Sequence, residues 1–363
     1  MDLMRAISSL IAAMFITAGT TPVISRIAAR WGLVTDRRFR PHPAHTHTGI
    51  IPRAGGFAIY LGMILTILLY LPLTKLVMGI SIAATILTIV GLLDDKADIN
   101  PYLRLATNAV AALIVIGAGA GIPFITNPLT GGVIRLDTWR LSFEFFGTHS
   151  VLVWADIFAF IWILWTMNIV GWSSGVDGQM PGFAAISAFI LGLLSLRYSS
   201  IDPSQGFVTV LAFLTAGAFL GFLPWNVFPQ KIMPGYSGKT LAGFFLAILG
   251  ILSFGKLGTA ILVLGVPTID AAVTLVRRIA KGKSPVWADR GHLHHLLLDL
   301  GWGKRRIALF YWMVSAILGV LALSVTSRQK VFAFLFVAVL IGGFITWVNI
   351  FSRLLNPHDP DNG

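Results

Sequence analysis

The sequence lacks cysteine and carries little charge. Without cysteine, the chain has neither disulfides nor thiolate chemistry. Only 12% of its residues are charged, which is about half the fraction usual in a soluble domain. Convincing internal repeats, low-complexity tracts and long polar stretches are also lacking. We also expect no soluble domain in this chain.

Hydrophobic residues dominate instead, at 56% of 363 residues with a mean hydropathy of +0.82. We therefore predict an all-α, polytopic integral membrane protein with about 11 transmembrane helices in a single domain over residues 1–363, since a span needs about 20 apolar residues. The first stretch lacks a clear cleavage site, so we expect it to remain as a span. The apolar stretches lie at 3–24, 54–72, 76–93, 103–121, 151–170, 180–196, 206–222, 239–254, 257–276, 307–327 and 331–354.

The positive charge is unevenly distributed between the two sides that alternating spans would create. One side carries nineteen of the 27 lysines and arginines, including the C-terminal Arg353. The positive-inside rule makes this side cytoplasmic, in a multi-pass protein of the cell membrane. Because the basic residues are scattered over loops, the net charge of +12 does not indicate nucleic acid binding. The predicted cytoplasmic loops are 25–54, 94–104, 171–179, 223–239 and 277–306.

The opposite side holds one long segment, residues 122–150. Its partial alternation of apolar and polar residues predicts a small external β-hairpin. We interpret this segment as a lid over helix ends and assign it no chemistry.

Two adjacent carboxylates, Asp94 and Asp95, end the third apolar stretch. Lysine, arginine or tryptophan would anchor a helix at a membrane surface better, so the pair indicates chemistry. We expect both aspartates at a solvated helix end. Only Asp270 lies plainly inside a span, seven residues before Arg277 on the same helix face. A functional role for Asp270 and a pairing with a neighbouring helix remain equal alternatives.

The predicted cytoplasmic loops contain most of the unusual polar residues. Carboxylates such as Asp177 suit Mg²⁺, whereas cations and glycine-rich turns suit phosphate oxygens. The "HLHH" stretch has no cysteine or second ligand set nearby, which disfavours zinc. "GYSGKT" has Met233 where a P-loop needs glycine, and no βαβ context. The loops therefore indicate a charged phosphate compound handled at a lipid surface.

The order of these motifs resembles the polyprenyl-phosphate N-acetylhexosamine-1-phosphate transferases, a superfamily that includes the phospho-N-acetylmuramoyl-pentapeptide translocases. The resemblance covers roughly residues 30–306. Its motifs are "IPRAGGFAI", "GLLDDKADINP", Asn168 with "SGVDGQMPG", "GFLPWNVFPQKI", "PTIDAAVTLVRR" and "DRGHLHHLLLDLGW". The paired aspartates and the H-x-H-H loop are the most specific of them.

The resemblance implies transfer of a sugar-1-phosphate from a UDP-sugar to membrane polyprenyl phosphate, for cell-envelope glycan synthesis. It implies that Asp94, Asp95 and Asp177 are catalytic. Asp94 and Asp95 would orient or deprotonate the lipid phosphate, and Asp95 and Asp177 would hold Mg²⁺. The histidines would contact the diphosphate, Lys96 and Arg104 would offset its charge, and Asn226 would bind nucleotide or shape its loop. The implied substrate-binding residues are Arg53, Lys96, Arg104, Asn168, Asn226, Lys239, His292, His294 and His295.

Four positions depart from the family pattern. Ser174 and Tyr236 stand where the family has carboxylates, Gly171 replaces an asparagine, and Lys239 replaces a serine. We therefore expect Mg²⁺ to be held weakly without substrate. The alternatives are a catalytically silent relative that binds polyprenyl phosphate and, more distantly, a lipid or nucleotide-sugar transporter. A transporter would place its polar groups near the bilayer midplane. The oligomeric state stays open, with a homodimer as one alternative.

Overall fold

The computed structural model describes residues 2–35, 49–127, 130–144, 148–253, 256–282 and 291–355. Helices make up most of this part of the chain, which confirms the predicted all-α class. The helices are α1 Asp2–Arg30, α2 Gly55–Tyr70, α3 Lys75–Ala97, α4 Pro101–Gly117, α5 Val153–Trp172, α6 Gln179–Tyr198, α7 Ser204–Asn226, α8 Gly235–Leu252, α9 Lys256–Val263, α10 Gly265–Ala280, α11 Leu293–Asp299, α12 Lys304–Ser324 and α13 Ser327–Leu355.

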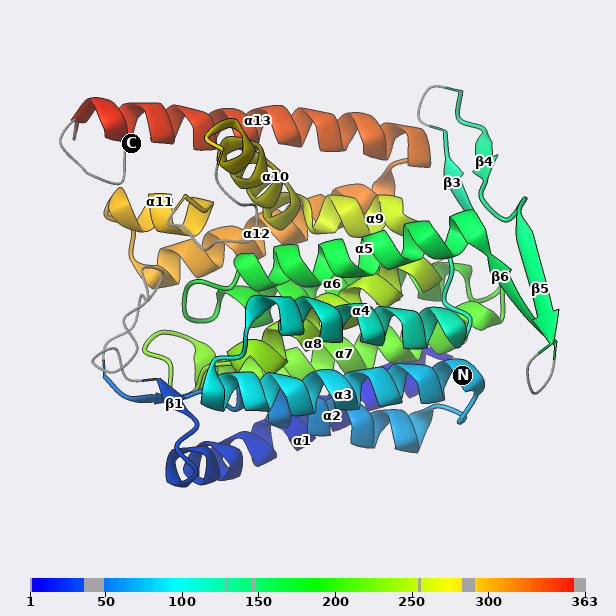
Figure 1. The fold of residues 1–363 in the computed structure, drawn as a ribbon, viewed down its shortest axis with the longest axis horizontal. Helices are drawn as coiled ribbons and strands as arrows, with labels where there is room; N and C mark the ends of the chain where they lie inside the picture. Colours follow the sequence, from blue (N-terminus) through cyan, green and yellow to red (C-terminus); the bar gives the residue numbers. More distant parts are fainter. Residues whose placement is uncertain are drawn as a thin grey trace.

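Most of the long helices run side by side, and α6, α7 and α8 form the centre of the bundle (Figure 1). Most residues of these three helices are buried, whereas less than a third of the α1 and α13 spans is buried. Large apolar side chains such as Leu69, Ile317 and Val339 are exposed on the outside. An apolar exterior of this kind needs lipid around it, as expected of a multi-pass membrane protein.

Eight helices of the described residues are long and apolar enough to cross a membrane, and a bent pair makes nine. The two further apolar stretches form α2 and α4, of 16 and 17 residues. At 1.5 Å per residue these helices are about 25 Å long, shorter than the hydrocarbon core of about 30 Å. The predicted membrane class is confirmed. The described residues reach the predicted eleven transmembrane helices only when these two short helices are counted.

The stretch at 257–276 is not the straight span that its hydropathy predicts. It is divided into α9 and α10, which meet at an angle of 79°. Pro267 lies in the first turn of α10 and has no amide hydrogen to bond the carbonyl of Val263, so the α9 ladder cannot continue. As a result, α10 leaves the direction of the bundle (Figure 1).

The segment at 122–150 contains two hairpins rather than the predicted single one. Antiparallel β3 (Phe124–Thr126) and β4 (Val133–Arg135) form the first, and β5 (Arg140–Glu144) and β6 (Thr148–Leu152) form the second. Both lie at one end of the bundle (Figure 1). At the opposite end, β1 (Val34–Thr35) pairs with β2 (Ile51–Pro52), close to where α2 begins.

The predicted cytoplasmic loops meet at this second end of the bundle. Gly55 donates a backbone hydrogen bond to Met233 at 3.0 Å, and Arg305 donates its Nε–H to the carbonyl of Phe228 at 3.0 Å. Residues 36–48 and 283–290, which belong to the predicted loops 25–54 and 277–306, lie outside the described residues.

The side of the membrane on which these loops lie stays a prediction. A reporter inserted after Gly303 should be cytoplasmic, and one inserted after Gly131 should lie outside, because nineteen of 27 basic residues are in the segments on the first side. Labelling by an impermeant reagent in intact cells distinguishes the two positions. The topology is wrong if both reporters are labelled from the same side.

Candidate active site

The carboxylate pair lies in the last turn of α3. Asp98 ends this helix in a left-handed conformation (φ 51°), and the side chain of Asn100 caps α4 by accepting the Tyr102 N–H at 2.9 Å. Asp94 is 1% exposed and Asp95 is fully buried. The prediction that both aspartates lie at a solvated helix end is therefore wrong. Their burial arises because α4 and α8 pack against this end of α3.

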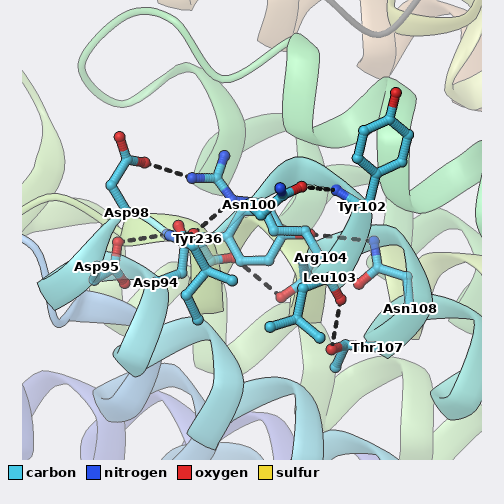
Figure 2. Close-up of polar contacts among 12 residues, drawn as sticks. Asp94, Asp95, Asp98, Asn100, Tyr102, Leu103, Arg104, Thr107, Asn108 and Tyr236 are labelled. Atoms are coloured by element: carbon cyan, nitrogen blue, oxygen red, sulfur yellow. Dashed lines mark hydrogen bonds and ion pairs between the residues drawn. The ribbon is translucent and has the colours of Figure 1, made fainter.

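Asp94 is held by α4. Its Oδ1 accepts the Nε–H of Arg104 and the backbone N–H of Ile99, the latter at 3.1 Å. The same guanidinium donates to Asp98 and lies over the ring of Tyr236, 5.2 Å from its centroid (Figure 2). Arg104 therefore joins the Asp94 carboxylate to the first turn of α8.

Asp95 is held by α8. Its Oδ1 accepts the backbone N–H of Tyr236 at 2.8 Å, and its Oδ2 lies 3.3 Å from the hydroxyl of Ser237. Arg53 completes the set, with Nε 3.3 Å from Oδ1. A carboxylate at the amino end of a helix is favoured by the helix dipole, so Asp95 caps α8.

A glycine makes this close approach to α8 feasible. Gly235 has a φ of +68°, which side chains rarely adopt, and a Cβ there would clash with the carboxylate of Asp95. The "PGYSG" segment therefore needs glycine at 235 for Asp95 to reach the helix end.

Asp177 forms a second centre in the loop between α5 and α6. Its Oδ1 accepts from the ammonium of Lys304 and from Nε2 of Gln230, each at 3.1 Å. Asn226 accepts the Gly178 N–H at 3.0 Å and donates to the carbonyl of Ile232 at 2.9 Å. Asn226 therefore shapes the loop, one of the two roles that the resemblance implied for it.

Sequence reasoning missed Lys304. A signal was present, because Lys304, Arg305 and Arg306 begin α12, where the helix dipole disfavours cations. Three basic residues at that position indicate anionic partners from elsewhere in the chain. Asp177 is the partner of Lys304.

The histidines are placed by α10. Asp270 accepts the Leu293 N–H at 2.7 Å and lies 3.1 Å from Nδ1 of His292. Arg277, two turns along the same helix, donates to the carbonyl of Gly291 at 3.2 Å. Asp270 is thus paired with a neighbouring element, the start of α11, as one of its two predicted alternatives has it. Asp270 and Arg277 fix the histidine segment from one helix face.

His294 lies at the centre of the three imidazoles. Its ring is stacked on that of His292, with centroids 5.8 Å apart, and is 4.2 Å from that of His295. Burial, followed by the nearby His295, His292 and Lys239, lowers the pKa of His294 well below its usual value, so the ring is neutral at pH 7. Its Nδ1 has no hydrogen-bond partner among the described residues. A neutral donor or acceptor is therefore available in the site.

Two further expected site residues lie on α3 and α5. Lys96 is exposed on the last turn of α3. Asn168 donates to the carbonyl of Leu164 in its own helix at 2.7 Å.

The described carboxylates do not fit a resident divalent ion. Each of Asp94, Asp95 and Asp177 is already bound to a cationic side chain. Within the described ranges, no three His, Asp or Glu side chains lie close enough to hold a metal together. Mg²⁺ needs several oxygen ligands in near-octahedral geometry, and the free carboxylates do not provide them.

Comparisons with known proteins relate this arrangement to a family. Residues 77–254 match the model of glycosyl transferase family 4. A Bacillus subtilis protein, the probable undecaprenyl-phosphate N-acetylglucosaminyl 1-phosphate transferase, is 26% identical over 90% of this chain and 86% of its own length. The chain is thus similar to glycosyl transferase family 4 over about half of its length. This confirms the resemblance to polyprenyl-phosphate hexosamine-1-phosphate transferases.

Other glycosyl transferase family 4 relatives are similar over nearly the whole chain. The Escherichia coli undecaprenyl-phosphate alpha-N-acetylglucosaminyl 1-phosphate transferase is 28% identical over 89% of this chain and 85% of its own length. The Mycobacterium leprae decaprenyl-phosphate N-acetylglucosaminephosphotransferase is 28% identical over 94% and 89%. All three relatives are named as transferases, so this protein is an enzyme, and the silent-relative and transporter alternatives are not favoured.

The match to the glycosyl transferase family 4 model extends from α3 to α8. It includes both aspartates of the pair, Asp177 and Lys239, whereas Arg53 and the three histidines lie outside it. Arg53 contacts Asp95, and α10 contacts α11. These contacts bring segments outside the match to the same end of the bundle as the matched residues.

Proposed function

We propose that this enzyme transfers a sugar-1-phosphate of the N-acetylhexosamine type from a UDP-sugar to membrane polyprenyl phosphate. The products are polyprenyl-diphospho-sugar and UMP, and the glycan belongs to the cell envelope. The observation that carries the proposal is the buried Asp94–Asp95 pair, surrounded by Arg53 and Arg104 at the end of an apolar bundle. The named relatives, which act on undecaprenyl or decaprenyl phosphate, support the same substrates.

The proposed reaction joins two anions. An oxygen of the lipid phosphate attacks the sugar-linked phosphorus of the UDP-sugar, and the bond from that phosphorus to the bridging oxygen breaks. The electron pair leaves with UMP. Charge repulsion and in-line positioning dominate the barrier of such a transfer. Arg53, Arg104, Lys239 and Lys304 provide the positive charge at this end of the molecule.

The two adjacent aspartates have different surroundings, and we assign them different tasks. Asp95 is bound to the amino end of α8, so it positions Tyr236 and Ser237. Asp94 makes no hydrogen bond or ion pair with the described residues of that helix and instead holds Arg104. Asp94 is therefore the better suited of the two to orient or deprotonate the lipid phosphate, through its own oxygens and through Arg104.

The histidines and the Asp177 loop are the proposed donor site. The neutral, buried His294 offers a hydrogen bond to the diphosphate without adding charge. The proposed nucleotide contacts are polar side chains of the neighbouring loop, those of Asp177, Lys304 and Gln230. No resident Mg²⁺ is proposed, and we expect any Mg²⁺ to bind the free protein weakly. The cytoplasmic face and a homodimer stay predictions.

One experiment tests the function directly. Purified protein is incubated with polyprenyl phosphate and a panel of UDP-sugars, and the release of UMP is measured. We expect release with a UDP-N-acetylhexosamine that depends on the lipid. If no sugar nucleotide releases UMP in the presence of lipid, the proposed reaction is wrong.

Replacing His294 with alanine should raise the KM for the UDP-sugar by at least about tenfold, because a hydrogen bond to a charged group contributes about 1.5–3 kcal/mol. The turnover at saturating donor should fall less. Steady-state UMP release over a range of UDP-sugar concentrations separates the two constants. Leu300→Ala, at the exposed end of the same helix, is the control. An unchanged KM in H294A would remove His294 from the donor site.

A further inference from the structure

The site has more positive than negative charge. The buried carboxylates Asp94 and Asp95 lie beside three cationic side chains, those of Arg53, Arg104 and Lys239. The two arginines are each bound to one of the aspartates. Asp98 also contacts Arg104, but it is 68% exposed and contributes little in water. Among the described residues, the third cation is therefore left without a carboxylate of its own.

Lys239 is that third cation, and its position is costly without a ligand. It lies in the second turn of α8, near the end where the helix dipole disfavours positive charge. It is half-buried, and no hydrogen bond or ion pair links it to any residue of the described ranges. Arg53 and Arg104 are near enough to repel it, and Asp95 and Asp94 are near enough to attract it, although both aspartates already hold an arginine. A half-buried cation that has no ion pair within the described ranges and lies beside two other cations favours the binding of an anion.

The neighbouring Tyr236 disfavours a metal ion beside Lys239. Its phenol accepts the Nδ2–H of Asn108 at 3.3 Å, and its ring packs against the guanidinium of Arg104 (Figure 2). This neutral ring and the cations around it occupy the first turns of α8, where a divalent ion would need carboxylates. The arrangement attracts phosphate oxygens and repels a metal ion.

We propose that Lys239, together with Arg53 and Arg104, neutralises the diphosphate of the donor in place of a divalent metal ion, so that transfer by this chain does not require Mg²⁺. The inference rests on the proposed function. The reaction needs no co-reactant, because UMP leaves as a phosphate anion and requires charge compensation rather than a proton. Side-chain cations can supply that compensation in a preorganised site.

The test compares UMP release in EDTA and in Mg²⁺ for the wild type, Lys239→Ser and Lys239→Arg. The wild-type rate in EDTA should stay within about threefold of that in Mg²⁺, whereas K239S in EDTA should lose about a hundredfold or more. Added Mg²⁺ should recover part of the K239S loss, and K239R should retain most activity in EDTA. Lys231→Ser is the matched control, since Lys231 is exposed and lies over the ring of Trp225, 5.3 Å from Nζ.

A calorimetric titration of UDP in EDTA provides a second measurement that does not depend on turnover. The Kd of K239S should be at least about tenfold weaker than that of the wild type, with an unchanged Tm showing that the variant is folded. If wild-type release stops in EDTA while K239S matches the wild type in Mg²⁺, the metal-replacement proposal is overturned and the transferase function stands. If no protein releases UMP in either buffer, the function fails, and equal UDP affinities would also overturn the role of Lys239.

Discussion

Replacing Asp94 with asparagine is expected to lower the turnover of UMP release by about a hundredfold or more. The buried carboxylate holds the Arg104 guanidinium and the Ile99 amide, and asparagine keeps the size while removing the charge. Arg104 would then turn toward Asp98 and leave the reacting phosphates. Losing one preorganised charged group typically costs a factor of about 100 to 1,000 in rate. Steady-state turnover at saturating lipid and UDP-sugar measures the effect.

The matched control for this variant is Asp98→Asn. Asp98 contacts the same guanidinium, but its side chain is 68% exposed. An exposed ion pair contributes only about 0–1 kcal/mol, so D98N should change turnover by no more than a few fold. Wild-type turnover in D94N would show that the pair has no catalytic part.

The second large effect is expected for Asp95→Asn, which should lower both the stability of the protein and its turnover. Asparagine can keep one acceptor for Tyr236 N–H, but it leaves Arg53 without its counter-ion and removes the negative charge at the end of α8. The free energy of unfolding should fall by about 2–3 kcal/mol. Thermal unfolding in detergent should show a larger loss of Tm for D95N than for D94N. Equal Tm values for D95N and the wild type would contradict the capping role.

The architecture was predictable to the extent that it depends on local hydropathy. Each apolar stretch became a helix, because a chain in lipid must satisfy its backbone hydrogen bonds internally. The 79° bend between α9 and α10 was missed, since a hydropathy window averages over Pro267 and does not register a missing amide hydrogen. The single hairpin became two because the alternation at 122–150 gives no information on where one strand pair ends.

The site was predictable where its residues lie in one motif and less so where they are distant. "DDKADINPYLR" contains Asp94 and its partner Arg104 within ten positions. The burial of Asp95 was not apparent, because it depends on Tyr236, 141 positions further along the chain. Lys304 is separated from Asp177 by 127 positions, and the basic residues that begin α12 do not indicate which carboxylate they meet. Contacts of that range follow from helix packing, which one sequence does not specify.

The central claim is that the sugar-linked phosphorus itself moves to the lipid. A UDP-N-acetylhexosamine with radioactive phosphorus at that position tests it most directly, in an incubation with the purified protein and polyprenyl phosphate. The proposed reaction predicts that the label appears in the organic, lipid-containing phase while unlabelled UMP is released. Label that stays in the aqueous phase as UDP, with the sugar alone on the lipid, would contradict it.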